Sequence, residues 1–367
     1  MTSLHRVRVL VLFGGRSAEH EISCLSVRNV VAALDGDRYD VTLVGITRDG
    51  RWTLVDAVPL AGEGLPSVSD DGDTVALVNG VKGPRLVRFH ADGDRITVLG
   101  PVDVCFPVLH GPYGEDGTVQ GLLASMGVPY VGADVASSAV GVDKRQMKHV
   151  FTARGLPQVP YVATSRSALE HDRTGILDDV EAQLRYPMFT KPARQGSSIG
   201  IRKVRDRREL SAGVDEALAY DRSVLIEQGL ERPRELECGV IGNTEIEVTA
   251  PGEVLTDNDF YDFEGKYLDD GLRLQCPADV PDAVAARCVD LARQAYVAIG
   301  ARGMARVDLF YADGEVLLNE INTIPGFTAA SMFPFVWAQQ GLPAPRLVER
   351  LLALAVEAAD ADGRFSP

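Results

Sequence analysis

The sequence is poor in cysteine and has no apolar run long enough to cross a membrane. Its five cysteines lie far apart, are odd in number and include no CxxC pair: Cys24, Cys105, Cys238, Cys276 and Cys288. This spacing argues against a disulfide framework, gives no sign of zinc and predicts a reducing, cytoplasmic environment. The apolar segment VRVLVLF near the N-terminus ends without a signal-type cleavage pattern, so we interpret it as a strand.

Positive charge is also scarce. The 37 Lys and Arg residues face 52 Asp and Glu residues, which gives a net charge of -15. Nucleic acids and anionic membranes attract basic surfaces, so we expect no general affinity for either. The first glycine turn, GGRSAEHE at 14–21, lacks both the GxGxxG spacing and the P-loop lysine, which argues against a Rossmann cofactor. A length of 367 residues with 46% hydrophobic content allows two or three domains.

The stretch with the most candidate metal-binding and catalytic side chains is ARVDLFYADGEVLLNEINTIPG, at 305–326. An Asp-Gly pair between alternating apolar residues predicts a β-hairpin. Strand alternation puts Arg306 and Asp308 on one face of the first strand, and Glu320 and Asn322 on one face of the second. If pairing aligns these faces, two carboxylates and an amide oxygen converge beside a guanidinium. Oxygen ligands of this kind suit Mg²⁺ that also binds phosphate; the alternative is a solvated strand face.

The N-terminal third reads as strands and helices of an α/β unit. Residues 7–13, 39–46 and 102–109 predict strands, 17–34 and 118–126 predict helices, and 56–96 predict loops with short strands. Glycine-rich loops carrying Glu19 and His110 follow two of these strands, where open α/β sheets bind ligands. Taken alone, His110 is better explained as a residue that caps its own loop, and only its neighbours favour a functional role.

A second unit begins near residue 131, where the spacing becomes helical. Further along, a strand carrying Lys191 enters a loop with Ser197 and Ser198, which offers backbone amides, hydroxyls and a positive charge to phosphate. An ordinary surface turn would look similar. Glu235 opens the next alternating strand, where a carboxylate could accept ribose hydroxyls or merely be solvated. The polar and aromatic segment 253–275 is longer than most loops, and we interpret it as an active-site lid.

Seven motifs together resemble those of D-alanine:D-alanine ligases of the ATP-grasp superfamily. They occur in the family's order over nearly the whole chain: GGRSAEHEIS, FPVLHGPYGEDGT, DKRQMK, KPARQGSSIG, FYDFEGKY, RVDLF, and NEINTIPGF followed by SMFP. The resemblance implies an ATP-grasp fold with three α/β domains and ATP between the central and C-terminal ones. We place an N-terminal pre-ATP-grasp domain at 1–132, a central ATP-grasp subdomain at 133–230 and a C-terminal subdomain with the hairpin and lid at 231–367.

The resemblance implies how the first D-alanine is bound. Glu19 would hold its ammonium group, and Ser197 and Tyr267 would be hydrogen-bonded to Glu19. His110 would lie near the same substrate.

The resemblance also implies how the second substrate and the tetrahedral intermediate are bound. Arg306 and the backbone amide of Gly326 would stabilise the oxyanion. The carboxylate of the second substrate would lie at Ser331 and Met332.

By the same resemblance, a third set of residues binds ATP and two Mg²⁺ ions, with Mn²⁺ as a substitute. The expected phosphate contacts are Lys144, Lys191 and Ser198, and Lys266 is also expected to bind ATP. The residues expected near adenine and ribose are Glu227, Gln228, Gly229, Leu230 and Glu235. The expected metal ligands are Asp308, Glu320 and Asn322.

The expected function is therefore ATP-dependent ligation of two D-alanines through an acyl phosphate, which supplies a peptidoglycan precursor. The resemblance further implies a homodimer. Two alternatives remain: a resistance-type ligase that joins D-alanine to D-lactate or D-serine, and a nucleotide-binding regulator without catalysis. The set of acidic and basic residues around the hairpin argues against the regulator.

Overall fold

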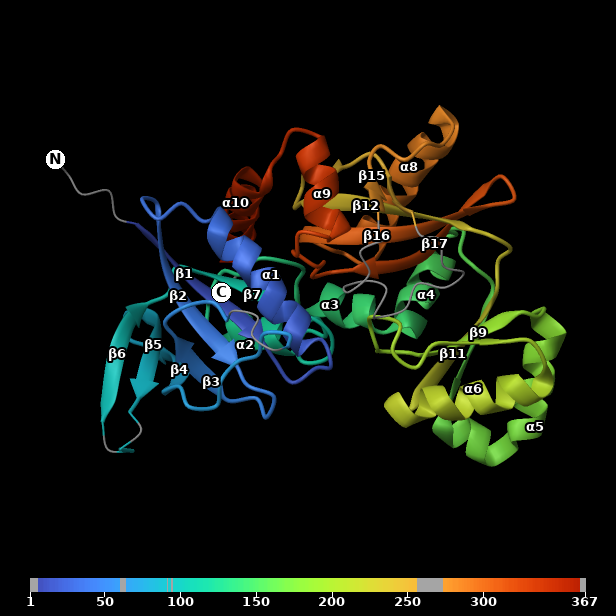
Figure 1. The fold of residues 1–367 in the computed structure, drawn as a ribbon, viewed down its shortest axis with the longest axis horizontal. Coiled ribbons are helices and arrows are strands. Elements are labelled where there is room, and N and C mark those ends of the chain that lie inside the picture. The colour runs from blue at the N-terminus through green and yellow to red at the C-terminus, as the bar shows by residue number, and fades with distance from the viewer. Residues whose placement is uncertain (1–5, 60–63, 91, 94, 256–272, 364–367) are drawn as a thin grey trace.

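The computed structural model describes residues 6–59, 64–90, 92–93, 95–255 and 273–363. Its strands form three separate sheets, each with helices packed against it. Figure 1 shows three lobes: the N-terminal lobe in blue and cyan, a second in green and yellow, and a third in orange. This mixed α/β architecture is the one that the sequence predicts.

The first sheet has seven strands in the order β6-β5-β4-β3-β2-β1-β7. At the centre of the sheet, β1 pairs in parallel with both of its neighbours, β2 and β7. Parallel strands are usually buried on both faces, which agrees with the continuous apolar sequence of β1. The region 56–96, expected to hold loops and short strands, adds an antiparallel meander to the edge. The elements are β1 (Val7–Gly14), α1 (His20–Ala33), β2 (Tyr39–Ile46), β3 (Trp52–Val55), β4 (Thr74–Gly80), β5 (Gly83–Phe89), β6 (Ile96–Pro101), β7 (Val104–Val108) and α2 (Thr118–Ser125).

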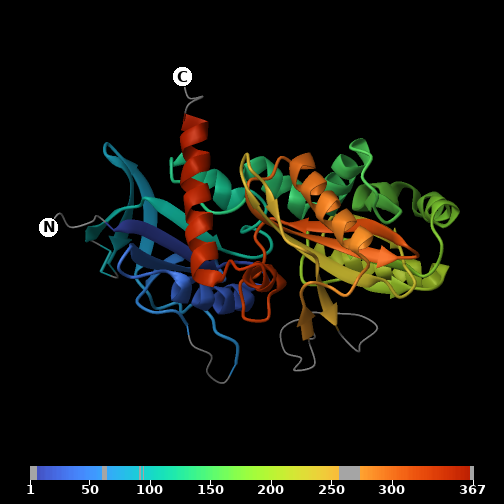
Figure 2. The same cartoon turned by 90° about the horizontal axis from the view of Figure 1, so that it is seen from above.

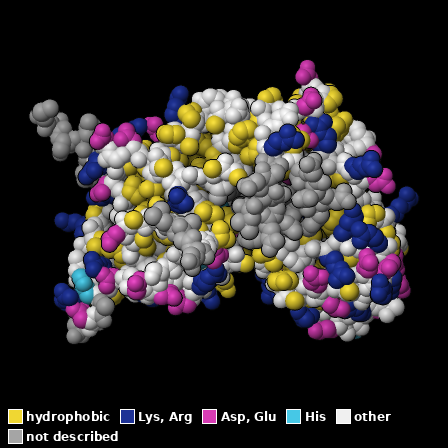
Figure 3. All heavy atoms as spheres, in the orientation of Figure 1, with side chains coloured by type: hydrophobic (Ala, Val, Ile, Leu, Met, Phe, Trp, Pro, Cys, Tyr) yellow, Lys and Arg dark blue, Asp and Glu magenta, His cyan; other side chains and the backbone are white. Residues whose placement is uncertain are grey.

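The second sheet is antiparallel, with the order β10-β9-β11-β8, and two helices pack on it. Figure 3 shows basic and acidic side chains intermixed over this lobe, where ion pairs such as Arg202–Glu216 lie at the surface. The elements are β8 (Tyr161–Ser165), α5 (Arg166–Gln183), β9 (Met188–Pro192), β10 (Arg202–Val204), α6 (Arg207–Tyr220) and β11 (Ser223–Gln228).

The third sheet has the order β15-β14-β12-β16-β17, with β13 paired to β12. Helix α8 covers it together with α3 and α4, because Met147 and Phe151 of α4 belong to its core. The elements are α3 (Val135–Val142), α4 (Lys144–Ala153), β12 (Arg234–Gly242), β13 (Glu247–Val248), β14 (Gly252–Leu255), β15 (Arg273–Gln275), α8 (Asp282–Ala298), β16 (Gly303–Ala312) and β17 (Glu315–Asn322).

The end of the chain returns to the first lobe. Helix α9 (Met332–Gln339) packs on β12, and α10 (Ala344–Gly363) packs on α1 and β7. Figure 2 shows α10, in red, lying along the N-terminal lobe. One apolar core therefore joins the first sheet to the last two helices, which fixes the first lobe against the third. The division at 132 and 230 stays a prediction.

The predicted hairpin is present, and its register contains a β-bulge. The turn at Asp313 and Gly314 has positive φ at both residues, as a type I′ turn requires, and pairs Ala312 with Glu315. This register continues to Leu309 and Leu318 and then shifts by one residue, so that Asn319 is the extra residue.

Beyond the bulge, Asp308 lies opposite Glu320 and Arg306 opposite Asn322. The alignment on which the proposed metal site depends is therefore present. None of the described helices is long and apolar enough to cross a membrane.

Candidate active site

A cavity of about 120 Å³ lies where the three lobes meet. It is lined from the first lobe by the loops after β1 and β7, from the second by the loop after β9, and from the third by the hairpin and the segment after it. Ten of the residues expected to form the site line it: Glu19, His110, Lys144, Ser197, Arg306, Glu320, Asn322, Gly326, Ser331 and Met332.

Glu19 links the first lobe to the second. It is only 8% exposed and lies immediately before α1, and Ser197 donates a hydrogen bond to its carboxylate. A Cβ atom at Gly111 would lie 2.6 Å from Glu19 Oε2, and one at Gly196 would lie 3.0 Å from it. Both glycines are therefore needed for the backbone to approach this carboxylate. Ser197 itself has a φ of 50°, a strained value for a residue with a side chain.

His110 is buried beside Glu115 and is held on two sides. Its Nδ1 donates to the Ile324 carbonyl at 3.2 Å, its Nε2 lies 3.2 Å from Ser26 Oγ, and Glu115 Oε1 is 3.7 Å from Nδ1. Burial by itself would lower the pKa of His110, but Glu115, Glu19 and the Ile324 carbonyl hold that pKa above its ordinary value. These carboxylates therefore stabilise the protonated form of His110 relative to its neutral form.

Arg306 is the central cation of the third lobe. It makes a bidentate contact with Asp308, with Nε and Nη2 each 2.7 Å from a carboxylate oxygen, and its Nε also lies 2.7 Å from Glu237 Oε2. Asn322 Nδ2 donates to Asp308 at 3.0 Å. Burial would lower the pKa of Arg306, but Asp308 and Glu237 hold that pKa well above its ordinary value.

Glu320 and Lys144 join the hairpin to the beginning of α4. Lys144 Nζ lies 3.3 Å from Glu320 Oε2 and donates to the backbone carbonyl of Gln195 at 2.9 Å. One ammonium group thus contacts a carboxylate of the third lobe and the serine-rich loop of the second. Its three donors suit phosphate equally well.

A buried ionic triad lies between the second and third lobes. Glu227 is 2% exposed, and its carboxylate lies between the ammonium groups of Lys148, at 2.6 Å, and Lys191. Burial would raise the pKa of Glu227, but the two lysines lower it to about 2. Burial lowers the pKa of Lys148, whereas for Lys191 the attraction of Glu227 outweighs burial and raises the pKa.

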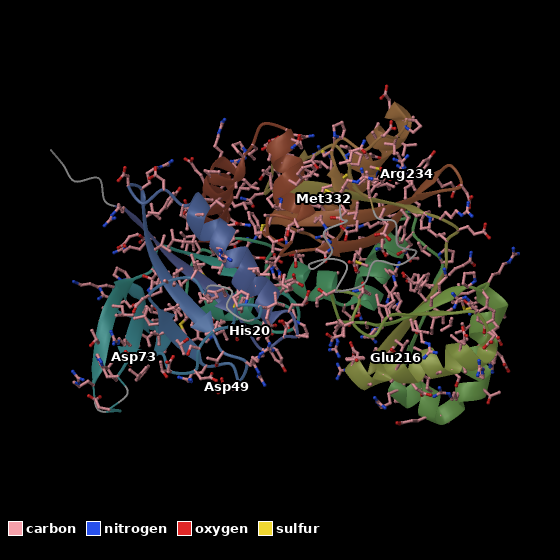
Figure 4. The ribbon with its side chains drawn as sticks, viewed as in Figure 1. His20, Asp49, Asp73, Glu216, Arg234 and Met332 are labelled. Carbon is pink, nitrogen blue, oxygen red and sulfur yellow. The ribbon has the colours of Figure 1, made fainter. Side chains whose placement is uncertain are left out.

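The segment after β17 contributes Gly326, Ser331 and Met332 to the lining of the cavity. A Cβ atom at Gly326 would lie 2.8 Å from Ser331 Oγ, so this position accommodates only glycine without movement of Ser331. Ser331 Oγ also accepts from the Thr328 amide at 3.0 Å, which fixes the turn that leads to Met332 at the beginning of α9. Met332 is labelled in Figure 4.

The remaining expected residues do not line this cavity. Lys191 lies on β9, Ser198 in the loop after β9 and Asp308 on β16, and Glu235 is exposed on β12. In the segment expected near adenine, the backbone amides of Gln228 and Gly229 donate to Pro160 and Pro187. The full set outside the lining is Lys191, Ser198, Glu227, Gln228, Gly229, Leu230, Glu235 and Asp308. Lys266 and Tyr267, with most of the expected lid at 253–275, lie outside the described residues.

Sequence reasoning missed three charged residues of the site. They are Glu115, which lies in the glycine-rich loop of His110, Lys148 of α4 and Glu237 of β12. Lys148 follows Lys144 by one helical turn, and Glu237 follows Glu235 by one strand period, so both spacings placed them near expected site residues. Spacing alone could not show that each contacts an oppositely charged partner.

Two family models match this chain. The model described as "D-ala D-ala ligase N-terminus" matches residues 8–133, and that described as "D-ala D-ala ligase C-terminus" matches residues 150–353.

Whole-chain comparisons agree with these matches. The chain is 47% identical to the D-alanine–D-alanine ligase of Kineococcus radiotolerans, over 97% of this chain and 98% of that one. It is 44% identical to that of Pseudarthrobacter chlorophenolicus, over 95% and 94%. Among solved structures, the D-alanine–D-alanine ligase from Coxiella burnetii superposes with a TM-score of 0.83 at 32% identity, over 98% and 97%. The VanG D-Ala:D-Ser ligase from Enterococcus faecalis superposes with 0.80 at 32% identity, over 96% and 100%.

Proposed function

Because the chain belongs to the D-alanine–D-alanine ligase family, with its ATP-grasp fold, we propose that the cavity between the three lobes joins two D-alanines at the expense of ATP. The observation that carries the proposal is that a carboxylate, a lysine, an arginine and a glycine turn from distant parts of the chain line one cavity: Glu19, Lys144, Arg306 and Gly326. The product serves peptidoglycan synthesis.

We propose the domain bounds that the sequence predicts, at 1–132, 133–230 and 231–367. ATP would lie between the second and third sheets, with its phosphates toward Lys144, Lys191 and Ser198, and Lys266 would also contact ATP. The ribose would be bound by Glu235 and the adenine by the segment from Glu227 to Leu230. This orientation of ATP is supported by the exposure of Glu235 and by the buried contact between Glu227 and Lys191.

The donor set of the hairpin fits Mg²⁺. Asp308, Glu320 and Asn322 supply oxygen ligands only, and the first two lie directly opposite each other. No three His, Cys, Asp or Glu side chains in the described ranges are arranged to hold a metal ion by themselves, so nucleotide oxygens would complete the coordination. When bound, Mg²⁺ would neutralise phosphate charge. We propose two ions, with Mn²⁺ as a substitute.

The first step moves the γ-phosphoryl group of ATP to the carboxylate of the first D-alanine, which forms an acyl phosphate and releases ADP. Glu19 would pair with the ammonium group of that substrate, and Ser197 and Tyr267 would orient Glu19. His110 would lie nearby, where the surrounding carboxylates raise its pKa. Lys144 and Lys191 would position the phosphates, so that positioning and charge neutralisation supply most of the rate.

In the second step the amine of the second D-alanine would give a proton to a base in or near the Ser197–Tyr267 network, attack the acyl carbon and expel inorganic phosphate. Arg306 and the Gly326 amide would stabilise the oxyanion of the tetrahedral intermediate, an effect of about 3 kcal/mol per donor in comparable sites. Ser331 and Met332 would receive the carboxylate of the second substrate. Their place at the beginning of α9, beside Gly326, supports this assignment.

A variant of Glu320 tests the proposal. Glu320→Gln keeps the size of the side chain and should lower D-alanine-dependent ADP release by at least about 100-fold, because a metal ligand and its charge are lost. Thermal unfolding should stay within a few degrees of the parent, since Glu320 belongs to the cavity wall and not to the apolar core. Retained activity in a folded variant would refute the metal assignment.

The acceptor is tested by product analysis. The protein, incubated with MgATP, D-alanine and an equal concentration of D-serine or D-lactate, should give D-alanyl-D-alanine as the main product by mass spectrometry. The similarity to the Enterococcus faecalis ligase makes D-serine the relevant competitor. A predominance of D-alanyl-D-serine or of the depsipeptide would replace the D-alanine assignment with that acceptor.

We further propose that the protein is a cytoplasmic homodimer. The family supports this proposal, and the five cysteines, separated along the chain and free, are compatible with a reducing compartment. Sedimentation velocity at micromolar concentration should give a single species of about twice the 39.5 kDa chain mass. A single species at the chain mass would refute the dimer.

A further inference from the structure

Glu237 lies in a row of carboxylates that crosses the third sheet. It is the direct partner of Asp308 in the pairing of β12 with β16, and Asp308 is the direct partner of Glu320 in the pairing of β16 with β17. Residues directly opposite in neighbouring strands have adjacent side chains on one face. Like charges in this arrangement repel, so the row needs cations to be stable.

Arg306 supplies one of these cations and contacts two members of the row. Its Nε is 2.7 Å from both Glu237 Oε2 and Asp308 Oδ1, and its Nη2 is 2.7 Å from Asp308 Oδ2. The side chains of Arg306, Glu237 and Asp308 are only 19%, 15% and 13% exposed. At such burial each contact is screened less by solvent than a surface ion pair.

The carboxylates of Asp308 and Glu237 have different roles in the proposed reaction. Both Asp308 oxygens bind Arg306 in the structure, yet Asp308 is also expected to bind Mg²⁺. A carboxylate that turns toward a metal ion cannot keep a bidentate contact with a guanidinium in the same direction. Glu237 lies on the other neighbouring strand and is not among the expected metal ligands, so it can keep Arg306 in place while Asp308 turns.

We propose that Glu237 is a positioning residue that holds the Arg306 guanidinium in the cavity when Asp308 is engaged by metal. This inference rests on the proposed function, in which Arg306 stabilises the oxyanion. Glu237 acts through Arg306 and does not itself contact the reacting atoms. Its contribution is specific to the tetrahedral intermediate and should not affect nucleotide binding.

The test uses two variants of Glu237 and a phosphinate analogue of D-alanyl-D-alanine, whose tetrahedral centre carries the charged oxygens of the intermediate. Titration calorimetry would measure the affinity of the whole protein for this analogue with MgADP, and separately for MgADP alone. Glu237→Ala should weaken the analogue about 10- to 100-fold and MgADP less than about threefold. Glu237→Gln keeps the size of the side chain and an oxygen beside Arg306 Nε, and should recover part of this loss.

Kinetics give a second readout. Glu237→Ala should lower kcat by a similar factor and leave the KM for ATP nearly unchanged, because the lost interaction is made only in the intermediate. Crystal structures of the variant with and without Mg²⁺ should show the Arg306 guanidinium displaced only when the metal is bound.

Glu253→Gln is the matched control. Glu253 is 5% exposed and makes a bidentate pair with Arg234 on the same sheet, at 2.7 and 2.6 Å, but it does not line the cavity. Arg234, labelled in Figure 4, lies on β12 three residues before Glu237. This variant should change thermal stability without a selective loss for the analogue. An equal selective loss would mean that any broken ion pair in the sheet has this effect, and would overturn the inference.

The Arg306→Met variant distinguishes a failure of the oxyanion role of Arg306 from a failure of the positioning role of Glu237. If this variant keeps the affinity for the analogue, the oxyanion role of Arg306 is wrong. If Arg306→Met loses that affinity while Glu237→Ala and Glu237→Gln both keep it, only the positioning role of Glu237 is wrong. A Glu237→Ala variant that weakens MgADP as strongly as the analogue would show a role in nucleotide or metal binding instead.

Discussion

The contact between Glu19 and Ser197 shows how single residues bring separate lobes together. Glu19 comes from the beginning of α1, Ser197 from a loop of the second lobe, and the two glycines that face this carboxylate come one from each lobe. A buried carboxylate without a partner costs free energy, so the contact favours approach of the two lobes. An ammonium group of a substrate would complete the charge balance.

The first residue-scale prediction concerns this carboxylate. Glu19→Gln should raise the KM for the first D-alanine by at least about 30-fold, because a charge-assisted contact worth roughly 2 kcal/mol is lost, while the KM for ATP changes little. Initial rates of ADP release over a range of both substrates measure the two constants. An equal increase in both would show that Glu19 supports the site as a whole and does not recognise the ammonium group.

The second residue-scale prediction concerns Lys148, which is 1% exposed and pairs with Glu227. Lys148→Met should destabilise the protein by about 3 kcal/mol, the low end of the range for removing one partner of a buried ion pair, because Lys191 still contacts Glu227. Denaturant unfolding at pH 7 measures the loss. The double variant Lys148→Met with Glu227→Gln should recover part of it, and a purely additive double variant would contradict the pairing.

At the scale of elements, the bulge in β17 decides which side chains of the hairpin face the cavity. Without it, the register set by the turn would put Asn319 opposite Asp308 and Ile321 opposite Arg306. A slip of one residue moves every side chain of a strand to the other face. The extra residue Asn319 absorbs that slip and brings Glu320 and Asn322 to the face of Asp308.

Deletion of Asn319 tests this reading of the bulge. The deletion removes the extra residue, so a regular ladder should keep the Asp308–Glu320 and Arg306–Asn322 pairs and bind MgATP within about threefold of the parent. Deletion of Leu318 instead shortens the strand equally but removes a fully buried side chain, which should cost about 2–5 kcal/mol. Calorimetric titration and unfolding distinguish the two. Loss of MgATP binding in a stable Asn319 deletion would show that the bulge itself shapes the site.

At the scale of the whole molecule, the last two helices close the chain on its first lobe. The core that joins α9 and α10 to α1, β1 and β7 holds the first and third lobes together, while the triad of Lys148, Glu227 and Lys191 lies between the second and third. The cavity lies at the junction of all three lobes. Ionic contacts between the lobes therefore contribute to the stability of the whole.

Acid should weaken the molecule through Glu227. Its pKa is about 2 when folded and near 4.3 when unfolded, so its stabilising contribution is complete above about pH 4.3 and is lost as the pH falls toward 2. This loss is on the order of 3 kcal/mol for a shift of about two units. Denaturant unfolding between pH 5 and 2.5 measures it.

Two variants serve as controls for the acid prediction. Glu227→Gln should show a weaker dependence on pH in this window. Glu216→Gln, which removes the exposed pair with Arg202, should keep the dependence of the parent. An unchanged pH dependence in Glu227→Gln would show that other carboxylates are responsible.

The sequence by itself determined the hairpin, its turn and the residue types of the cavity. An Asp-Gly turn between alternating strands and glycine-rich loops after apolar strands are local signals, because they depend on backbone preferences and on the two-residue period of a strand. These signals were enough to select Asp308, Glu320 and Asn322 as one set. The family resemblance added the order of the motifs along the chain.

Only the tertiary structure decided how these residues are brought into contact. Alternation fixes the faces within one strand, but the residue opposite depends on the partner strand and on the bulge at Asn319. The sequence shows Lys148 on a helix and Glu237 on a strand, but their partners Glu227 and Arg306 lie about 70 to 80 positions away along the chain. Such contacts form only when several lobes pack together and exclude water, because burial is what makes an opposite charge necessary.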